Sequence, residues 1–133
     1  MIVDLIGLLD DGSERSPRVP ASARAAVEVS IGVTTTFRLT IKTVGGIPFK
    51  PTGTVKLAVK RSYLDSRPLV ELTGSRPVGA EPNRLDFTLL PAATKQLAPG
   101  RYIYDVMMVV SGTNRQPLIP ISSLRLLPSV SLP

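Results

Sequence analysis

Few side chains in this sequence are suited to chemistry. The chain has no cysteine and no histidine, which leaves Asp, Glu, Lys and Tyr as candidate general acids and bases. Asp10 and Asp11 form its one adjacent carboxylate pair, and with Glu14 they resemble a calcium-loop spacing only faintly. A turn is the ordinary use of Asp before a residue such as Gly12. We therefore expect a non-enzymatic protein with no catalytic residue, no cofactor and no metal.

The basic residues offer a second possible chemistry, which is contact with nucleic acid. The 133 residues include 16 Lys and Arg against 10 Asp and Glu, a formal net charge of +6. Lys56 and Lys60 share one face of an expected strand, with Arg61 and Arg67 close behind them in sequence. Base-stacking surfaces use several aromatic rings, and Tyr63 is the one aromatic residue expected near this patch. A solvated sheet face is the simpler interpretation, and nucleic-acid contact remains the alternative function.

The spacing of breakers and apolar residues predicts the elements that carry these side chains. Thirteen prolines and ten glycines divide the chain into short segments, and period-two alternation recurs in them, most clearly over residues 35–41 and 55–59. About eight short strands at intervals of 8 to 15 residues are typical of an antiparallel all-β sandwich. A helical turn is expected over 91–97, and separate strands over 115–119 and 122–127. No segment approaches the roughly 20 apolar residues of a membrane span, so we expect no membrane association.

The run 97–106 predicts a specific structural corner. Pro99 and Gly100 form a turn, and alternation then places Tyr102, Tyr104 and Val106 on the inner face of a strand. A tyrosine directly after such a turn, with its hydroxyl bonded to upstream backbone, is the tyrosine corner of immunoglobulin-like sandwiches. Leu97, Gly100 and Tyr102 are the residues that we assign to this corner.

Both ends of the chain carry many apolar residues. We predict residues 1–23 to be an N-terminal arm and linker, and residues 24–133 to be the sandwich domain. Residues 2–9 would then add as a strand to the sheet of a neighbouring subunit. The C-terminal apolar residues fit the core or an interface equally well. The residues assigned to subunit contacts are Ile2, Leu5, Ile6, Leu8, Leu9, Leu127, Val130 and Leu132.

The order of these motifs resembles a known group of modules. The strand 35–41, the Gly46-Ile47-Pro48 turn, the segments 51–59 and 84–89 and the corner 97–106 are similar to immunoglobulin-like modules of tailed-bacteriophage virion proteins, such as baseplate and tail-fibre N-terminal domains. The resemblance covers residues 30–128. It departs from those modules at Val33-Thr34, where an Asp-Thr pair is frequent, and in the additional leader 1–23.

The resemblance implies a structural role. We expect a tail, baseplate or head-surface component that is assembled in the host cytoplasm into the virion. Its partners would be other virion proteins and further copies of the chain in a homo-oligomer.

Overall fold

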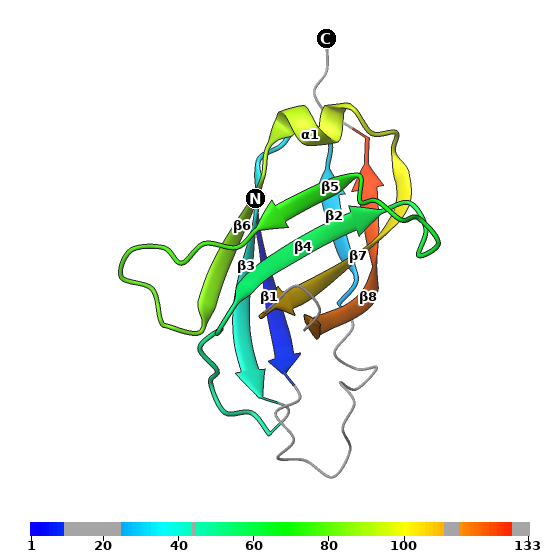
Figure 1. The fold of residues 1–133 in the computed structure, drawn as a ribbon. Helices are drawn as coiled ribbons and strands as arrows, with labels where there is room; N and C mark the ends of the chain where they lie inside the picture. Colours follow the sequence, from blue (N-terminus) through cyan, green and yellow to red (C-terminus); the bar gives the residue numbers. More distant parts are fainter. Residues whose placement is uncertain (10–24, 44, 111–114, 129–133) are drawn as a thin grey trace.

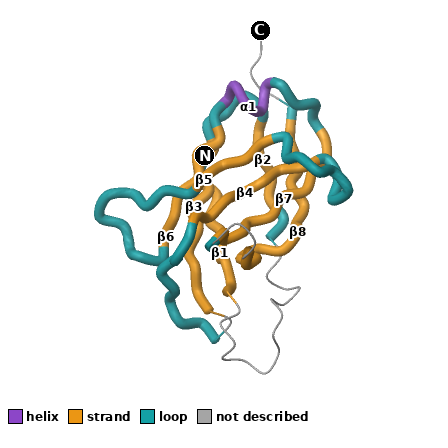
Figure 2. Tube along the Cα trace, in the orientation of Figure 1, coloured by secondary structure: helices purple, strands orange, loops and turns teal. Residues whose placement is uncertain are grey.

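The fold is a sandwich of two β-sheets with one short helix at one end (Figures 1 and 2). The computed structural model describes residues 1–9, 25–43, 45–110 and 115–128. Along these residues the elements are β1 (Ile2–Leu9), β2 (Val27–Ser30), β3 (Thr35–Thr43), β4 (Thr54–Lys60), β5 (Val70–Thr73), β6 (Arg84–Leu89), α1 (Pro91–Lys95), β7 (Gly100–Val109) and β8 (Arg115–Leu127). The predicted all-β sandwich is confirmed.

The strand order matches an immunoglobulin-like connectivity. One sheet has the order β1-β3-β6 and the other has the order β2-β8-β7-β4-β5. If β3 and β6 are strands B and E, then β4, β7 and β8 are strands C, F and G, and β5 extends that sheet as C′ does in variable-type domains. The prediction of a purely antiparallel sandwich is wrong in two places. β1 runs parallel to β3, and β2 runs parallel to β8.

Alternating side chains build the core between the sheets. In β3, Phe37, Leu39 and Ile41 are fully buried, while the residues between them remain partly exposed. The inner faces of β4, β6 and β7 show the same alternation, as one-sided burial of a sheet requires. α1 begins with the predicted proline in its first turn, where the missing N–H costs no hydrogen bond.

The N-terminal segment 2–9 belongs to this sandwich, which corrects the predicted arm. β1 pairs with β3 along its whole length, from Ile2–Thr36 to Leu9–Thr43. Leu5 and Leu9 each retain only 3% of their exposure and join the main core. The domain therefore includes residues 2–9, and Leu5 and Leu9 are core residues rather than interface residues. The linker 10–23, with Asp10, Asp11 and Glu14, lies outside the described residues.

The last strand also differs from expectation. β8 runs unbroken from Arg115 to Leu127, where two strands separated near Pro120 were predicted. β8 pairs with β7 on one side along its length, but with β2 on the other side only from Leu124 onward. Pro117 and Pro120 therefore lie where no described strand pairs with the outer edge of β8, a position at which sheets accept proline.

Candidate functional site

The predicted tyrosine corner is formed at the start of β7. The Tyr102 ring is buried, and its hydroxyl donates a hydrogen bond to the Ala98 carbonyl oxygen at 2.6 Å. Gly100 has a φ of +145°, a conformation that L side chains rarely adopt, and Leu97 packs against the core. The corner thus fixes how the chain enters β7, the central strand of the larger sheet.

Replacing Tyr102 by phenylalanine should remove this hydrogen bond and keep the ring. We expect the free energy of unfolding to fall by about 0.5 to 1.5 kcal/mol. Urea unfolding of both proteins under the same conditions measures the difference. An unfolding midpoint that does not move would contradict a stabilising role for the hydroxyl.

Tyr104 attaches the start of β2 to the same strand. Its hydroxyl donates to the Ala25 carbonyl oxygen, and the Ala25 N–H donates to Ser122 Oγ at 3.1 Å. Ser122 Oγ in turn donates to the Pro120 carbonyl oxygen at 2.7 Å. Desolvation by burial raises the pKa of Tyr104 to about 12, partly opposed by a hydrogen bond with Ser122. Tyr104 occupies the position at which antibody domains have their second cysteine. In this chain the hydrogen bond from Tyr104 to Ala25 links β7 to the segment before β2.

The predicted basic patch has mixed charge in the structure. Lys56 and Lys60 lie on the outer face of β4, as predicted, but Lys56 Nζ is 3.2 Å from Glu71 Oε1 on β5. Arg61 lies over the Tyr102 ring, 5.7 Å from its centroid. The sequence did not predict the carboxylate of Glu71 at this site. The strand register that places Glu71 beside β4 cannot be read from local sequence.

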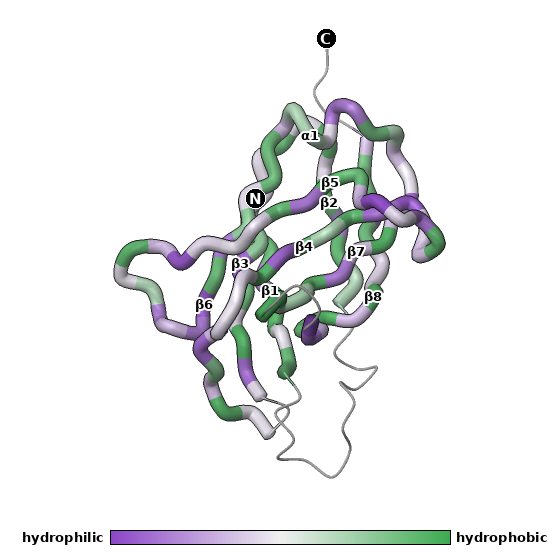
Figure 3. Tube along the Cα trace, viewed as in Figure 1, coloured by the Kyte–Doolittle hydropathy of each residue, from purple (hydrophilic) through white to green (hydrophobic). Residues whose placement is uncertain are grey.

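Lys56, Lys60 and Glu71 line a groove across the larger sheet. The groove has a volume of about 410 Å³ and lies over β4, β5 and β7, with further walls from the β4–β5 connection and β8. Figure 3 shows hydrophilic residues gathered at the β4–β5 connection. The charged side chains in the groove are Lys56, Lys60, Arg115, Glu71 and Asp105.

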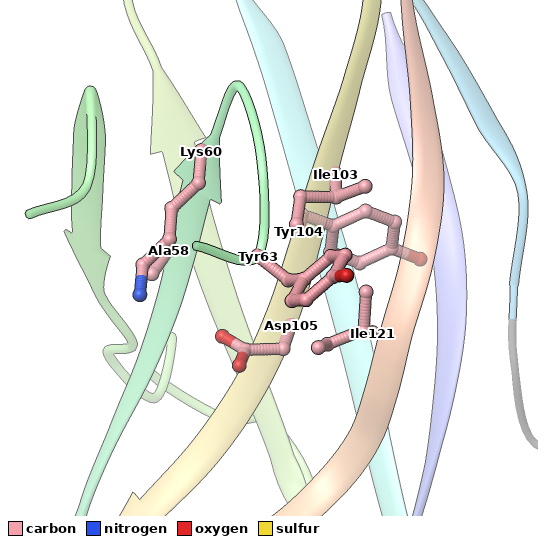
Figure 4. Close-up of a pocket in the computed structure, with 7 residues that line it drawn as sticks. All are labelled: Ala58, Lys60, Tyr63, Ile103, Tyr104, Asp105 and Ile121. Carbon is pink, nitrogen blue, oxygen red and sulfur yellow. The ribbon is translucent and has the colours of Figure 1, made fainter. Parts of the chain in front are cut away.

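A smaller hollow beside the groove contains Asp105. Figure 4 shows the Tyr63 ring over β7 near Ile121, with the Asp105 carboxylate beside it. Asp105 lies where the β7–β8 pairing shifts from Tyr104–Ser122 to Val106–Ile119, and bulges of this kind redirect a side chain. Burial raises the pKa of the Asp105 carboxyl, and the positive charge of Lys60 opposes that rise. At about 40 Å³ the hollow has room for no more than a few atoms.

The mixed charge leads to a prediction about nucleic acid. Replacing Lys56, Lys60, Arg61 and Arg67 by alanine should weaken binding to duplex DNA no more than replacing four cations elsewhere, because carboxylates interrupt this patch. The matched control replaces Lys42, Lys50, Arg76 and Lys95. Fluorescence anisotropy of a labelled duplex across a salt series compares the two variants. A much larger loss in the first variant would indicate a real nucleic-acid site.

The remaining predicted contact residues divide into three groups. Ile2 and Ile6 are 56% and 55% exposed on the outer face of β1, and Leu8 lies half-buried in the same row. Leu127 is half-buried at the end of β8. Val130 and Leu132 lie outside the described residues. The structure thus gathers one predicted set, Ile2, Ile6 and Leu8, on a single sheet edge.

Two further observations bear on the kind of site present. Among the described residues, no group of three or more acidic side chains is placed to hold a metal ion. No helix in the described part of the chain is long and apolar enough to cross a membrane.

Several solved structures have a similar course of the chain, and two of them are described here. No protein-family model and no curated protein matches the sequence. The N-terminal domain of phage TP901-1 ORF48 aligns with 97% of this chain and 99% of its own, at 12% identity and a TM-score of 0.45. The cysteine protease inhibitor EhICP2 from Entamoeba histolytica aligns with 94% of this chain and 96% of its own, at 13% identity and a TM-score of 0.39.

Proposed function

We propose that this chain is a structural, non-enzymatic component of a bacteriophage virion, acting through contacts between subunits. The observation that carries the proposal is the apolar row on the outer edge of β1. Ile2 and Ile6 are each more than half exposed, although the inner side of the same strand completes the core. A row of exposed apolar side chains on a folded domain marks a surface that another molecule covers.

Other exposed apolar residues support the same interpretation. Tyr63, Leu64 and Leu69 lie in or beside the β4–β5 connection, and Ile121 lies on the adjoining outer face of β8. Aromatic and aliphatic side chains surrounded by charged ones are typical of protein interfaces, whose rims are polar. The virion context itself rests on the resemblance of residues 30–128 to phage sandwich modules.

The test is the composition of purified particles. Virions of a phage that encodes this chain would be purified on a density gradient, and the chain would be quantified by mass spectrometry against the major capsid protein. The proposal predicts a fixed number of copies per particle that survives washing in high salt. Absence of the chain from infectious particles would overturn it.

A further inference from the structure

The three-stranded sheet has one edge that is already occupied and one that is open. Along β6, the Ser75 N–H donates to the Asp86 carbonyl oxygen at 3.0 Å and the Asp86 N–H donates to the Ser75 carbonyl oxygen at 2.8 Å. Along β1, no strand among the described residues is hydrogen-bonded on the side away from β3, and Leu118 of β8 packs against Gly7. Backbone groups at such an edge can pair with another strand.

The hydrogen bonds to β3 identify which residues of β1 point outward. The Thr36 N–H donates to the Met1 carbonyl oxygen at 2.9 Å, and the Met1 amino group donates to the Thr34 carbonyl oxygen at 3.0 Å. In a parallel ladder this alternation continues at every second residue, so the odd-numbered residues bond to β3. The amides that face outward belong to Ile2, Asp4, Ile6 and Leu8.

This edge lacks the features that protect the edges of the other sheet. The edge strands β2 and β5 have four residues each and carry an exposed Glu28 and Glu71. β1 has eight residues without lysine or proline, and its one charge, Asp4, is the direct neighbour of Arg38 on β3. Long, apolar, unprotected edges pair with other strands, so β1 is the strand of this chain best suited to do so.

We propose that β1 pairs in antiparallel fashion with β1 of a second copy, about a two-fold axis through Leu5. This inference rests on the proposed function, since it names the partner of the same apolar row. The product would be one continuous six-stranded sheet across two subunits. Ile2 would face Leu8 of the partner subunit, and Asp4 would face Ile6 of the partner subunit, in hydrogen-bonded pairs that form about eight backbone bonds.

The sequence of β1 favours this register over its neighbours. A shift in one direction places Asp4 directly opposite Asp4 of the partner subunit, and like charges in that position are destabilising. A shift in the other direction leaves Ile2 without a partner inside β1. Only the central register pairs all four outward residues within β1. The contact is isologous, so it closes as a dimer without extending into a fibre.

Cysteine cross-linking tests the register directly, because the native chain has no cysteine. Asp4→Cys and Ile6→Cys chains would be purified separately and then mixed under mild oxidation. The proposed register brings Cα atoms of these two positions to about 5.5 Å, which is within disulfide range. The mixture should form a disulfide-linked dimer of one chain of each kind, while each variant alone should stay largely monomeric on a non-reducing gel. Cross-linking of Asp4→Cys alone, or no cross-linking in the mixture, would overturn the proposal.

Sedimentation measurements on full-length variants provide the matched control. Ile6→Glu should raise the dimer dissociation constant at least about tenfold, because each copy would place the new carboxylate directly opposite Asp4 of the partner subunit. Thr40→Glu adds the same charge on the same sheet face one strand further in, beside Ile6, and should leave dimerisation unchanged. Circular dichroism confirms that both variants fold. Equal dimerisation of the two variants, or a monomeric native chain, would contradict the proposal, and incorporation into particles would still decide the proposed function separately.

Discussion

Leu5→Ala is expected to lower the free energy of unfolding by about 2 to 5 kcal/mol, the usual cost of removing a fully buried leucine side chain. Leu5 retains only 3% of its exposure and belongs to the main core. Because β1 contributes Leu5 and Leu9 to that core, the variant would lose apolar contacts and leave a cavity. Urea unfolding monitored by circular dichroism measures the change.

The neighbouring residue supplies the control for this prediction. Ile6 lies on the same strand but is 55% exposed, so Ile6→Ala should change the free energy of unfolding by no more than about 0.5 kcal/mol. Equal and small effects at the two positions would mean that β1 does not form part of the core in the isolated protein. Residues 2–9 would then behave as the predicted arm and not as a core strand.

Stability should fall in alkaline solution because of Tyr104. Burial raises the pKa of Tyr104 from its ordinary 10.0 to about 12, so the folded state holds the phenol proton more tightly than the unfolded state. Below pH 10 both states are protonated and this contribution is complete. As the pH rises from 10 to 12 the unfolded state loses the proton first, and the free energy of unfolding should fall by about 2 to 3 kcal/mol.

Tyr104→Phe isolates that effect from the titration of lysines and other tyrosines. The variant loses the hydrogen bond to Ala25 at every pH, so it should start less stable and then lose less stability between pH 10 and 12. The measurement is urea unfolding at several alkaline pH values for both proteins. Parallel losses in the two proteins would show that the Tyr104 hydroxyl does not set the alkaline limit.

The sequence predicted those features that local pattern determines. Alternation in 35–41 and 55–59 placed the inner faces of β3 and β4 correctly. The Pro99-Gly100 turn followed by Tyr102 predicted a hydrogen bond from the Tyr102 hydroxyl to upstream backbone, and the structure shows that its acceptor is the Ala98 carbonyl oxygen. Each of these depends on residues a few positions apart, where turn chemistry and the period of a strand act directly.

The features that were missed depend on partners that are distant in sequence. The apolar run 2–9 suits a strand on any sheet, and nothing within it specifies pairing with β3 of its own chain. Tyr104 meets Ala25, 79 residues away, and Glu71 reaches Lys56 only through the β4–β5 register. Such contacts require knowledge of which strands are neighbours, and that information lies in the packing of the complete domain.

The corrected place of β1 changes how the chain is expected to act in an assembly. The N-terminal segment completes the domain with its inner side and leaves Ile2, Ile6 and Leu8 for contact on its outer side. The mixed-charge groove lies on the other sheet. The domain thus presents an apolar edge and a charged face as two separate surfaces, which suits a subunit with more than one neighbour.

Electron cryomicroscopy of purified particles that contain this chain tests the central claim most directly. The account predicts that density for the sandwich is found at defined positions of the virion, with the outer edge of β1 covered by another subunit. A map in which the chain is absent from the particle, or in which Ile2 and Ile6 face solvent at every position, would contradict it.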